Sequence, residues 1–184
     1  MSELDPCLRR ILWQPLDYLA AGRLHLPEAF TGEPARQALN RMLLEGLQLP
    51  MSLPAPGSFS RVWIRQWRHL PQIARLMGAQ RLWPELARGA RMGLLSAQER
   101  DFAQRAIGPR RAWALSVDHP LLEQVEAVGL AELLAFSGEL PAALSERVRL
   151  LFPETVVAWQ ARLPVVRPDP TLFFLAVQHV RHHS

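Results

Sequence analysis

The apolar residues of the central stretch, residues 59–108, recur at the spacing of a helix and not at that of a strand. Phe59, Trp63 and Trp67 follow one another at four-residue intervals. At about 100° of rotation per residue, these three side chains lie on one side of a helix. The same periodicity recurs along the chain, whereas alternation of apolar and polar residues is nearly absent. The sequence therefore predicts an all-α fold built from short helices.

Proline, glycine and capping residues predict where the first two central helices begin and end. Ser58 is the expected N-cap of the first helix, and Pro71, which has no amide to donate, should end or kink it near His69–Leu70. A second helix is expected from Pro71 to Met77. Gly78 is expected to close it, because glycine readily takes the left-handed conformation found at helix C-termini.

Two further helices are expected in the rest of the central stretch. Pro84 is placed to be the first helical residue of one. Its inward residues would be Leu86, Ala87, Ala90 and Leu94. Ser96 and Glu99 have the spacing of a capping box, in which each side chain accepts a hydrogen bond from an otherwise unpaired amide. The helix that this box opens should stop at Gly108-Pro109. Its inward residues would be Phe102, Ala103, Ala106 and Ile107.

The N-terminal third predicts two helices and one long loop. The first helix begins at Pro6 after Asp5, and the second begins at Glu33-Pro34 and ends at Gly46. The buried stripe of the second helix would consist of Ala35, Ala38, Leu39, Met42 and Leu43. The prolines of residues 47–57 predict a loop that could act as a hinge or be disordered.

The helix expected after Asp118-His119-Pro120 leaves one question open. Its apolar face rotates at Gly129, so that either the helix breaks there or its second half is buried nearly all round. Pro141 is expected to open the following helix, with Leu144 and Leu151 directed inward.

Two segments near the C-terminus complete the expected helices. Residues 154–162 are ambiguous, because Thr155-Val156-Val157 favours a strand while the spacing of Trp159 permits a helix, which we prefer. Asp169-Pro170 is expected to cap the last helix. The C-terminal turn of that helix is expected to fray.

The length of 184 residues predicts one compact domain that buries roughly 70% of its unfolded surface. The single expected core comprises Phe59, Trp63, Trp67, Phe102, Val125, Leu144, Leu151 and Phe173. No apolar run approaches the ~20 residues of a membrane span, and no secretory signal is recognisable. Cys7 is the only cysteine and is expected to be a buried structural residue. A single cysteine agrees with a reducing compartment, so we expect a cytoplasmic protein.

Charge is distributed unevenly along the chain. There is no lysine, which is best explained by codon bias in a GC-rich genome. Residues 59–108 carry nine arginines and three acids, whereas residues 118–154 carry seven acids and two arginines. The molecule should therefore have one basic and one acidic region.

These regions suggest two surfaces for binding partners. Arg61, Arg65 and Arg68 fall on the side of their helix opposite Trp63 and Trp67. The tryptophans are therefore expected in the core, which weakens the alternative that they stack on nucleic-acid bases beside the arginines. The basic face is either solvated or meets an acidic protein, and we favour the second. The residues expected to contact partners are Arg61, Arg65, Arg68, Arg75, Glu123 and Glu126.

No catalytic or metal-binding arrangement stands out in the sequence. His179, His182 and His183 have a spacing that could direct imidazoles at one metal, but no nearby carboxylate or cysteine completes a tetrahedral site. Cys7 has no neighbours that mark it as an activated nucleophile, and Asp118-His119 has no accompanying nucleophile motif. We therefore expect neither an enzyme nor a cofactor or metal ion.

Three blocks of the sequence together resemble one family. The first is Pro15-Leu16-Asp17-Tyr18-Leu19 followed by Leu26-Pro27. The second is Ala74-Arg75-Leu76-Met77-Gly78-Ala79 followed by Leu94-Leu95-Ser96-Ala97-Gln98-Glu99. The third runs from Gly129-Leu130-Ala131 through Pro141-Ala142-Ala143-Leu144 to Arg147-Val148-Arg149-Leu150-Leu151-Phe152-Pro153. In order and spacing these blocks resemble the sorting-platform adaptors of bacterial type III secretion systems, the SctK or YscK family, and the lysine-free composition fits a Pseudomonas-type member.

The resemblance implies a non-enzymatic cytoplasmic adaptor at the inner-membrane secretion apparatus. Such adaptors link the cytoplasmic forkhead-associated-like domain of the inner-membrane ring protein (SctD) to the pod protein (SctQ), which carries the ATPase complex. The family supplies no catalytic residues to transfer. The alternative from another class is an arginine-rich helical nucleic-acid-binding protein, which would lose affinity steeply as salt rises.

Overall fold

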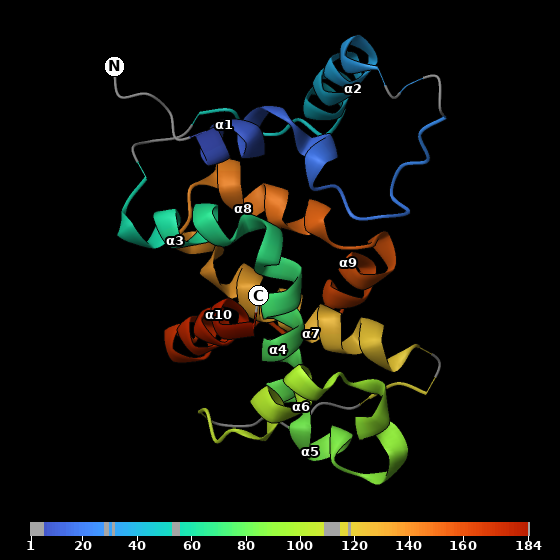
Figure 1. Cartoon of the computed structure of the whole chain (residues 1–184), viewed down its shortest axis with the longest axis vertical. Helices are drawn as coiled ribbons and strands as arrows, with labels where there is room; N and C mark the ends of the chain where they lie inside the picture. The colour runs from blue at the N-terminus through green and yellow to red at the C-terminus, as the bar shows by residue number, and fades with distance from the viewer. Residues whose placement is uncertain are drawn as a thin grey trace. The chain divides into compact units, whose positions relative to one another are not determined.

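The structure is a computed structural model, and it describes residues 6–27, 30, 32–52, 56–108, 115–117 and 119–183. These residues form α-helices, 3-10 helices and connecting segments, and none of them belongs to a β-strand (Figure 1). The prediction of an all-α fold is therefore confirmed. Asp5 and Asp118, the expected caps of two helices, lie outside the described residues.

Contacts along the chain group it into two compact units. Unit 1 comprises Met1–Arg68 and Ser137–Glu154, and unit 2 comprises His69–Phe136 and Thr155–Ser184. The helices at the start of unit 1 are α1 (Pro6–Trp13), η1 (Pro15–Asp17), α2 (Glu33–Gly46) and α3 (Ser58–Gln66). Its returning segment contains α8 (Ala142–Val148) and η6 (Arg149–Leu151).

Unit 2 holds the remaining α-helices. They are α4 (Leu70–Arg81), α5 (Trp83–Leu86), α6 (Ala97–Gln104), α7 (Leu121–Leu134), α9 (Glu154–Gln160, of which Glu154 belongs to unit 1) and α10 (Pro170–His183). Its 3-10 helix is η4 (Gly89–Leu94), while η3 (Trp67–His69) and η5 (Ala135–Gly138) contain the unit boundaries. The preference for a helix over residues 154–160 and the helix begun by Asp169-Pro170 are both confirmed.

The expected core residues are buried, but they divide between the units. Trp63, Trp67, Leu144 and Leu151 are buried in unit 1, and Phe102, Val125 and Phe173 are buried in unit 2. Phe59 is only half-buried. In unit 1 the ring of Tyr18 meets that of Trp67 edge to face, with centroids 5.5 Å apart, a geometry that aromatic pairs favour.

The helix α2 buries only part of the stripe that its sequence predicts. Ala35, Leu39 and Leu43 are half-buried, Ala38 and Met42 are exposed, and Asn40 is the buried residue of this helix. The reason is polar: the Asn40 Oδ1 atom accepts a hydrogen bond of 2.9 Å from the Leu16 amide, and the Arg36 guanidinium lies 2.9 Å from Asp17. Asn40 and Arg36 therefore lie on the inward side of α2 together with its half-buried apolar residues, where they satisfy the backbone and charge of η1.

The start of α3 lies one residue from its predicted position, whereas α2 ends where predicted. The N-cap of α3 is Gly57, and Ser58 is already helical. The last residue of α2 is Gly46, as predicted, but the left-handed residue after it is Gln48, with φ of 49°. The Gln48 and Leu49 amides donate to the carbonyls of Glu45 and Leu44, the two bonds of a Schellman motif.

The largest correction concerns α4, which lies beside α7 in unit 2 (Figure 1). Gly78 does not close a helix at Met77, because α4 continues to Arg81. For α7 the second of the two alternatives is confirmed, since the helix continues through Gly129 and its second half is buried nearly all round. Both glycines are needed for the close approach of the two helices, since an added Cβ on Gly78 would lie 1.9 Å from the Val125 carbonyl oxygen.

The segment between α4 and α6 also differs from its prediction. The expected single helix from Pro84 is interrupted after Leu86 and resumes as the 3-10 helix η4, leaving Ala87, Ala90 and Leu94 exposed. The capping box of α6 is confirmed: the Ser96 hydroxyl accepts from the Glu99 amide at 3.2 Å, and the Glu99 carboxylate accepts from the Ser96 amide at 2.7 Å. This helix stops at Gln104, earlier than expected, and Ala106 is exposed.

Candidate protein-interaction surfaces

The basic stripe, defined as Arg61, Arg65 and Arg68, lies on the exposed side of α3 and η3. On the opposite side Trp63 is fully buried and Trp67 is 4% exposed, as the helical spacing predicts. None of the three guanidinium groups makes an ion pair with a residue that the structure describes. The stripe is therefore a run of solvent-facing positive charge without an internal counter-charge among those residues.

Arg75, the fourth basic residue expected to bind a partner, is engaged inside unit 2. Its Nε atom lies 2.8 Å from a Glu99 carboxylate oxygen and 3.8 Å from one of Glu126. Burial raises the pKa of Glu126 above its ordinary value, Arg75 opposes that rise, and the nearby charges of Glu123 and Glu99 add to it. Two carboxylates, those of Glu99 and Glu126, thus share one guanidinium.

Glu123 completes the acidic face, defined as Glu123 and Glu126 on α7. Glu123 is half-buried and has no ion pair with a described residue, whereas Glu126 is partly neutralised by Arg75. The opposite side of α7 is fixed by Gln124, whose side chain exchanges two hydrogen bonds of 2.8 Å with the Ser116 backbone and donates another to the His119 carbonyl. This clamp holds the start of α7, so the acidic face is presented by an ordered helix.

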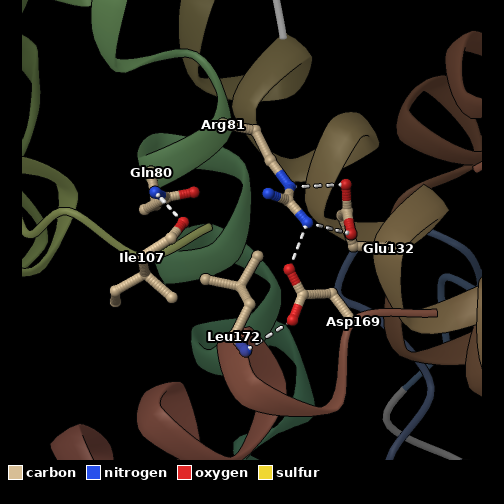
Figure 2. A network of polar contacts seen from close by, with 6 residues as sticks. All are labelled: Gln80, Arg81, Ile107, Glu132, Asp169 and Leu172. Atoms are coloured by element: carbon tan, nitrogen blue, oxygen red, sulfur yellow. Dashed lines mark hydrogen bonds and ion pairs between the residues drawn. The ribbon is translucent and has the colours of Figure 1, made fainter. Parts of the chain in front are cut away.

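A buried ionic network, absent from the sequence predictions, lies at the C-terminal end of α4 (Figure 2). The Arg81 Nε atom donates to a Glu132 oxygen at 2.8 Å, and its Nη2 atom donates to an Asp169 oxygen at 2.8 Å. Burial alone would lower the pKa of the Arg81 guanidinium, but the hydrogen bonds and charges of Glu132 and Asp169 hold it above its ordinary value. The other Asp169 oxygen accepts from the Leu172 amide at 3.0 Å, which caps α10.

The network joins three helices of unit 2 through side chains, and its neighbour Gln80 donates to the Ile107 carbonyl at 2.7 Å (Figure 2). One sequence signal could have found it. Glu132 is a lone acid inside the apolar run Val128–Leu134, and a charged residue in such a place must find a partner when it is buried. Nothing in the sequence identified Arg81 as that partner.

In unit 1 the fully buried Arg147 performs a comparable structural role without any carboxylate. Its Nη1 atom donates to the Pro50 and Ala143 carbonyls at 2.7 and 2.8 Å, and its Nη2 atom donates to the Leu12 carbonyl at 3.1 Å. Burial lowers the pKa of Arg147, while the nearby Tyr18 hydroxyl opposes the shift. These bonds anchor the described start of the 47–57 loop to α1 and α8.

A second arginine ties the N-terminal part of unit 1 to its returning segment. The Arg23 Nε atom donates to the Phe152 carbonyl at 2.6 Å, and the Ala20 amide donates to the Leu150 carbonyl at 2.8 Å. Ala20 and Arg23, which lie between the two parts of the first resemblance block, therefore bond to the end of the third block within unit 1.

Among the described residues, the histidines and Cys7 do not come together in a candidate catalytic or metal-binding site. His179 is buried and its Nε2 atom lies 3.2 Å from the Gln98 carbonyl, while the His183 Nδ1 atom lies 2.8 Å from the His179 carbonyl. The turn expected to fray is helical through His183. Cys7 is exposed on α1 and not buried as expected. Over the described ranges no three His, Cys, Asp or Glu residues are grouped as metal ligands.

The fold and these surfaces fit a helical component of a larger assembly. Buried arginines bond within each unit, and exposed charge lies on helix faces. Among the residues described, no helix combines the length and apolar character that crossing a bilayer requires.

Comparison with known proteins gives the family. The family model described as bacterial type III secretion apparatus protein (OrgA_MxiK) matches residues 8–182. The oxygen-regulated invasion protein OrgA of Salmonella typhimurium, found in strains 14028s, SL1344 and LT2, is 33% identical over 181 residues, covering 95% of this chain and 87% of OrgA. The chain belongs to the OrgA/MxiK family of type III secretion apparatus proteins, which confirms the SctK resemblance. No solved structure matches it.

Proposed function

We propose that this protein is a non-enzymatic adaptor of the type III secretion sorting platform, working at the cytoplasmic face of the inner membrane. In this role it links the cytoplasmic domain of the inner-membrane ring protein (SctD) to the pod protein (SctQ). The observation that carries the proposal is the exposed basic stripe of α3 and η3, which makes no ion pair among the described residues, on a member of a secretion apparatus family. A bridging protein needs two surfaces that do not overlap, and the stripe is suited to be one of them.

The basic stripe is proposed to meet an acidic surface on one partner. Its charges have no internal counter-charge among the described residues, so an acidic partner would not have to displace an existing ion pair. Complementary charge speeds and orients docking, and rim charges act more on the association rate and its salt dependence than on affinity.

The acidic face is proposed to meet the other partner. Glu123, which makes no ion pair with a described residue, would supply negative charge to this face. Arg75 would contribute through its ion pairs with Glu99 and Glu126, by setting how much negative charge the face presents.

The test is to replace Arg61, Arg65 and Arg68 together by glutamate and to titrate the variant with SctQ and with the SctD domain at low and moderate salt. We expect the fold to survive, because the buried side of α3 is untouched, and we expect binding to one partner only to be lost. The matched control replaces three other exposed arginines by glutamate, which changes the net charge equally; these are Arg91, Arg167 and Arg181. Unchanged binding of both partners by the stripe variant would show the stripe to be solvated only.

A further inference from the structure

The helix α2 buries far less of its surface than the other two helices of the same length. Only Asn40 is buried among its 14 residues, whereas α7 and α10, also of 14 residues, bury nine and six. Met42 is 65% exposed, and Ala38 is exposed as well. Because a helix normally turns its apolar residues toward a core, those left uncovered on α2 are candidates for contact with another molecule.

The uncovered residues lie on the side of α2 that is turned away from η1. Asn40 and Arg36 define the inward side of the helix, because both bond to η1. At about 100° of rotation per residue, the side chains opposite these two recur at three- and four-residue intervals. They are all exposed, and they define the outward face of α2: Ala38, Arg41, Met42 and Glu45.

The outward face carries two charges of opposite sign. Arg41 and Glu45 are four residues apart, so they lie one turn apart on the same side of the helix. Neither makes an ion pair with a residue that the structure describes. Met42 lies between them along the chain, on the flank of the face opposite Arg41. The face thus combines a flexible apolar side chain with one positive and one negative charge.

This arrangement makes the face complementary to itself. A two-fold rotation that lays two copies of α2 antiparallel keeps each side chain on its own flank of the interface. When Met42 contacts the same residue of the second copy, Arg41 of each chain lies beside Glu45 of the other. The small side chain of Ala38, at the centre of the face, allows the two helices to approach closely. Two parallel copies would instead place Arg41 against Met42.

We propose that the outward face of α2 binds a second copy of this chain, through two antiparallel α2 helices related by a two-fold axis. The contact consists of the paired Met42 side chains and two ion pairs between Arg41 and Glu45. The outward face shares no residue with the basic stripe or the acidic face, so this self-association is independent of the adaptor role. One pair of helices falls short of the roughly 1,200–2,000 Å² that stable interfaces bury, so the dimer should be weak and dependent on concentration.

The first test is charge reversal, read by sedimentation velocity from about 1 μM to 1 mM protein, the range of weak association. Arg41→Glu and Glu45→Arg should each raise the dissociation constant of the dimer by about tenfold or more, because like charges then meet. An equimolar mixture of these two variants should dimerise like the parent, since every reversed charge meets its opposite. Arg167→Glu, exposed and outside α2, is the control and should also dimerise like the parent.

The second test locates the contact by disulfide trapping in a Cys7→Ser background, since Cys7 is exposed. Met42→Cys should form a disulfide between chains under mild oxidation. Glu33→Cys, at the exposed start of α2, should not, because antiparallel pairing at residue 42 places the two copies of residue 33 about 27 Å apart. Circular dichroism verifies that each variant keeps its helical content.

A parent that stays monomeric throughout the concentration series would overturn the inference, as would a mixture of the two charge variants that dimerises no better than either alone. Each variant is also titrated with SctQ and with the SctD domain. If the parent is monomeric and Met42→Ser weakens binding to one of these proteins, the outward face belongs to that protein and not to a second copy. The proposed function fails separately, when the parent binds neither protein.

Discussion

Gly78 of α4 and Gly129 of α7 lie where the two helices cross, and each glycine packs against the backbone of the opposite helix. An added Cβ on Gly129 would lie 1.9 Å from the Ala74 carbonyl oxygen, and one on Gly78 would lie 2.9 Å from the Gly129 amide nitrogen. Each helix thus packs backbone to backbone at this point. The crossing positions Arg81 and Glu132, one turn further along each helix, within hydrogen-bonding distance.

Replacing Gly78 by alanine should therefore force α4 and α7 apart. The clash is with backbone, which cannot rotate away, so we expect a loss of roughly 1–3 kcal/mol or more in the free energy of unfolding. Gly138→Ala is the control, because nothing lies within 4 Å of the Cβ it would add. Denaturant melts of parent and both variants provide the measurement, and a Gly78→Ala melt that superimposes on the parent would contradict this packing.

Removing Glu132 should show the cost of breaking a buried ion pair. Glu132→Leu removes one of the two carboxylates that pair with the Arg81 guanidinium among the described residues, and breaking such a buried pair costs roughly 3–5 kcal/mol. Arg81→Met combined with Glu132→Leu should cost less than the sum of the single changes. Arg105→Gln breaks an exposed ion pair and should leave the melt almost unchanged. Additive losses in the double variant would show that the two side chains are not coupled.

These two cases show which parts of the fold the sequence could predict. Helix periodicity located the buried side of α3, and the Ser96–Glu99 spacing located a cap, because those features depend on residues within two turns of each other. Glycine was misinterpreted at position 78 because a close helix crossing depends on a second helix almost fifty residues away. Asn40 was missed for the same reason, since its partner is the Leu16 amide.

The candidate surfaces, too, could be predicted only where they depend on nearby residues. Helical spacing predicts that the basic stripe lies on the side of its helix opposite Trp63 and Trp67, and the structure has this arrangement. The pairing of Arg75 with Glu99 and Glu126 brings three helices together and could not be inferred from spacing.

Gln48 occupies a position that favours glycine, so Gln48→Gly should stabilise the protein. Its φ of 49° lies in the left-handed region, where a side chain is unfavourable and glycine is not. We expect a gain of about 0.5–1 kcal/mol, measured by thermal or denaturant unfolding. The control is Gln37→Gly within α2, which should destabilise because its backbone is helical. A loss of stability in Gln48→Gly would contradict the Schellman geometry.

His179 should make stability depend on pH. Burial lowers its pKa below the ordinary 6.5, so the folded state resists protonation while the unfolded chain accepts it. The stability associated with the neutral ring is present above pH 6.5 and is lost as the pH falls through the lowered folded value. His179→Leu should abolish the part of the decline in stability below pH 6.5 that protonation of this ring causes.

The exposed His182 supplies the control for that measurement. His182→Leu should retain the pH dependence of the parent in melts across the same range. If the parent and His179→Leu lose stability in parallel, His179 is not the group responsible.

The adaptor role is tested most directly by mixing this protein with purified SctQ and the SctD cytoplasmic domain and measuring the mass of the eluted species by light scattering. We predict one ternary complex that forms only when this protein is present, and that fails to form with the Arg61, Arg65 and Arg68 to glutamate variant while one binary complex persists. Elution of SctQ and SctD together in its absence, or binding of the two partners only in competition with each other, would contradict the account.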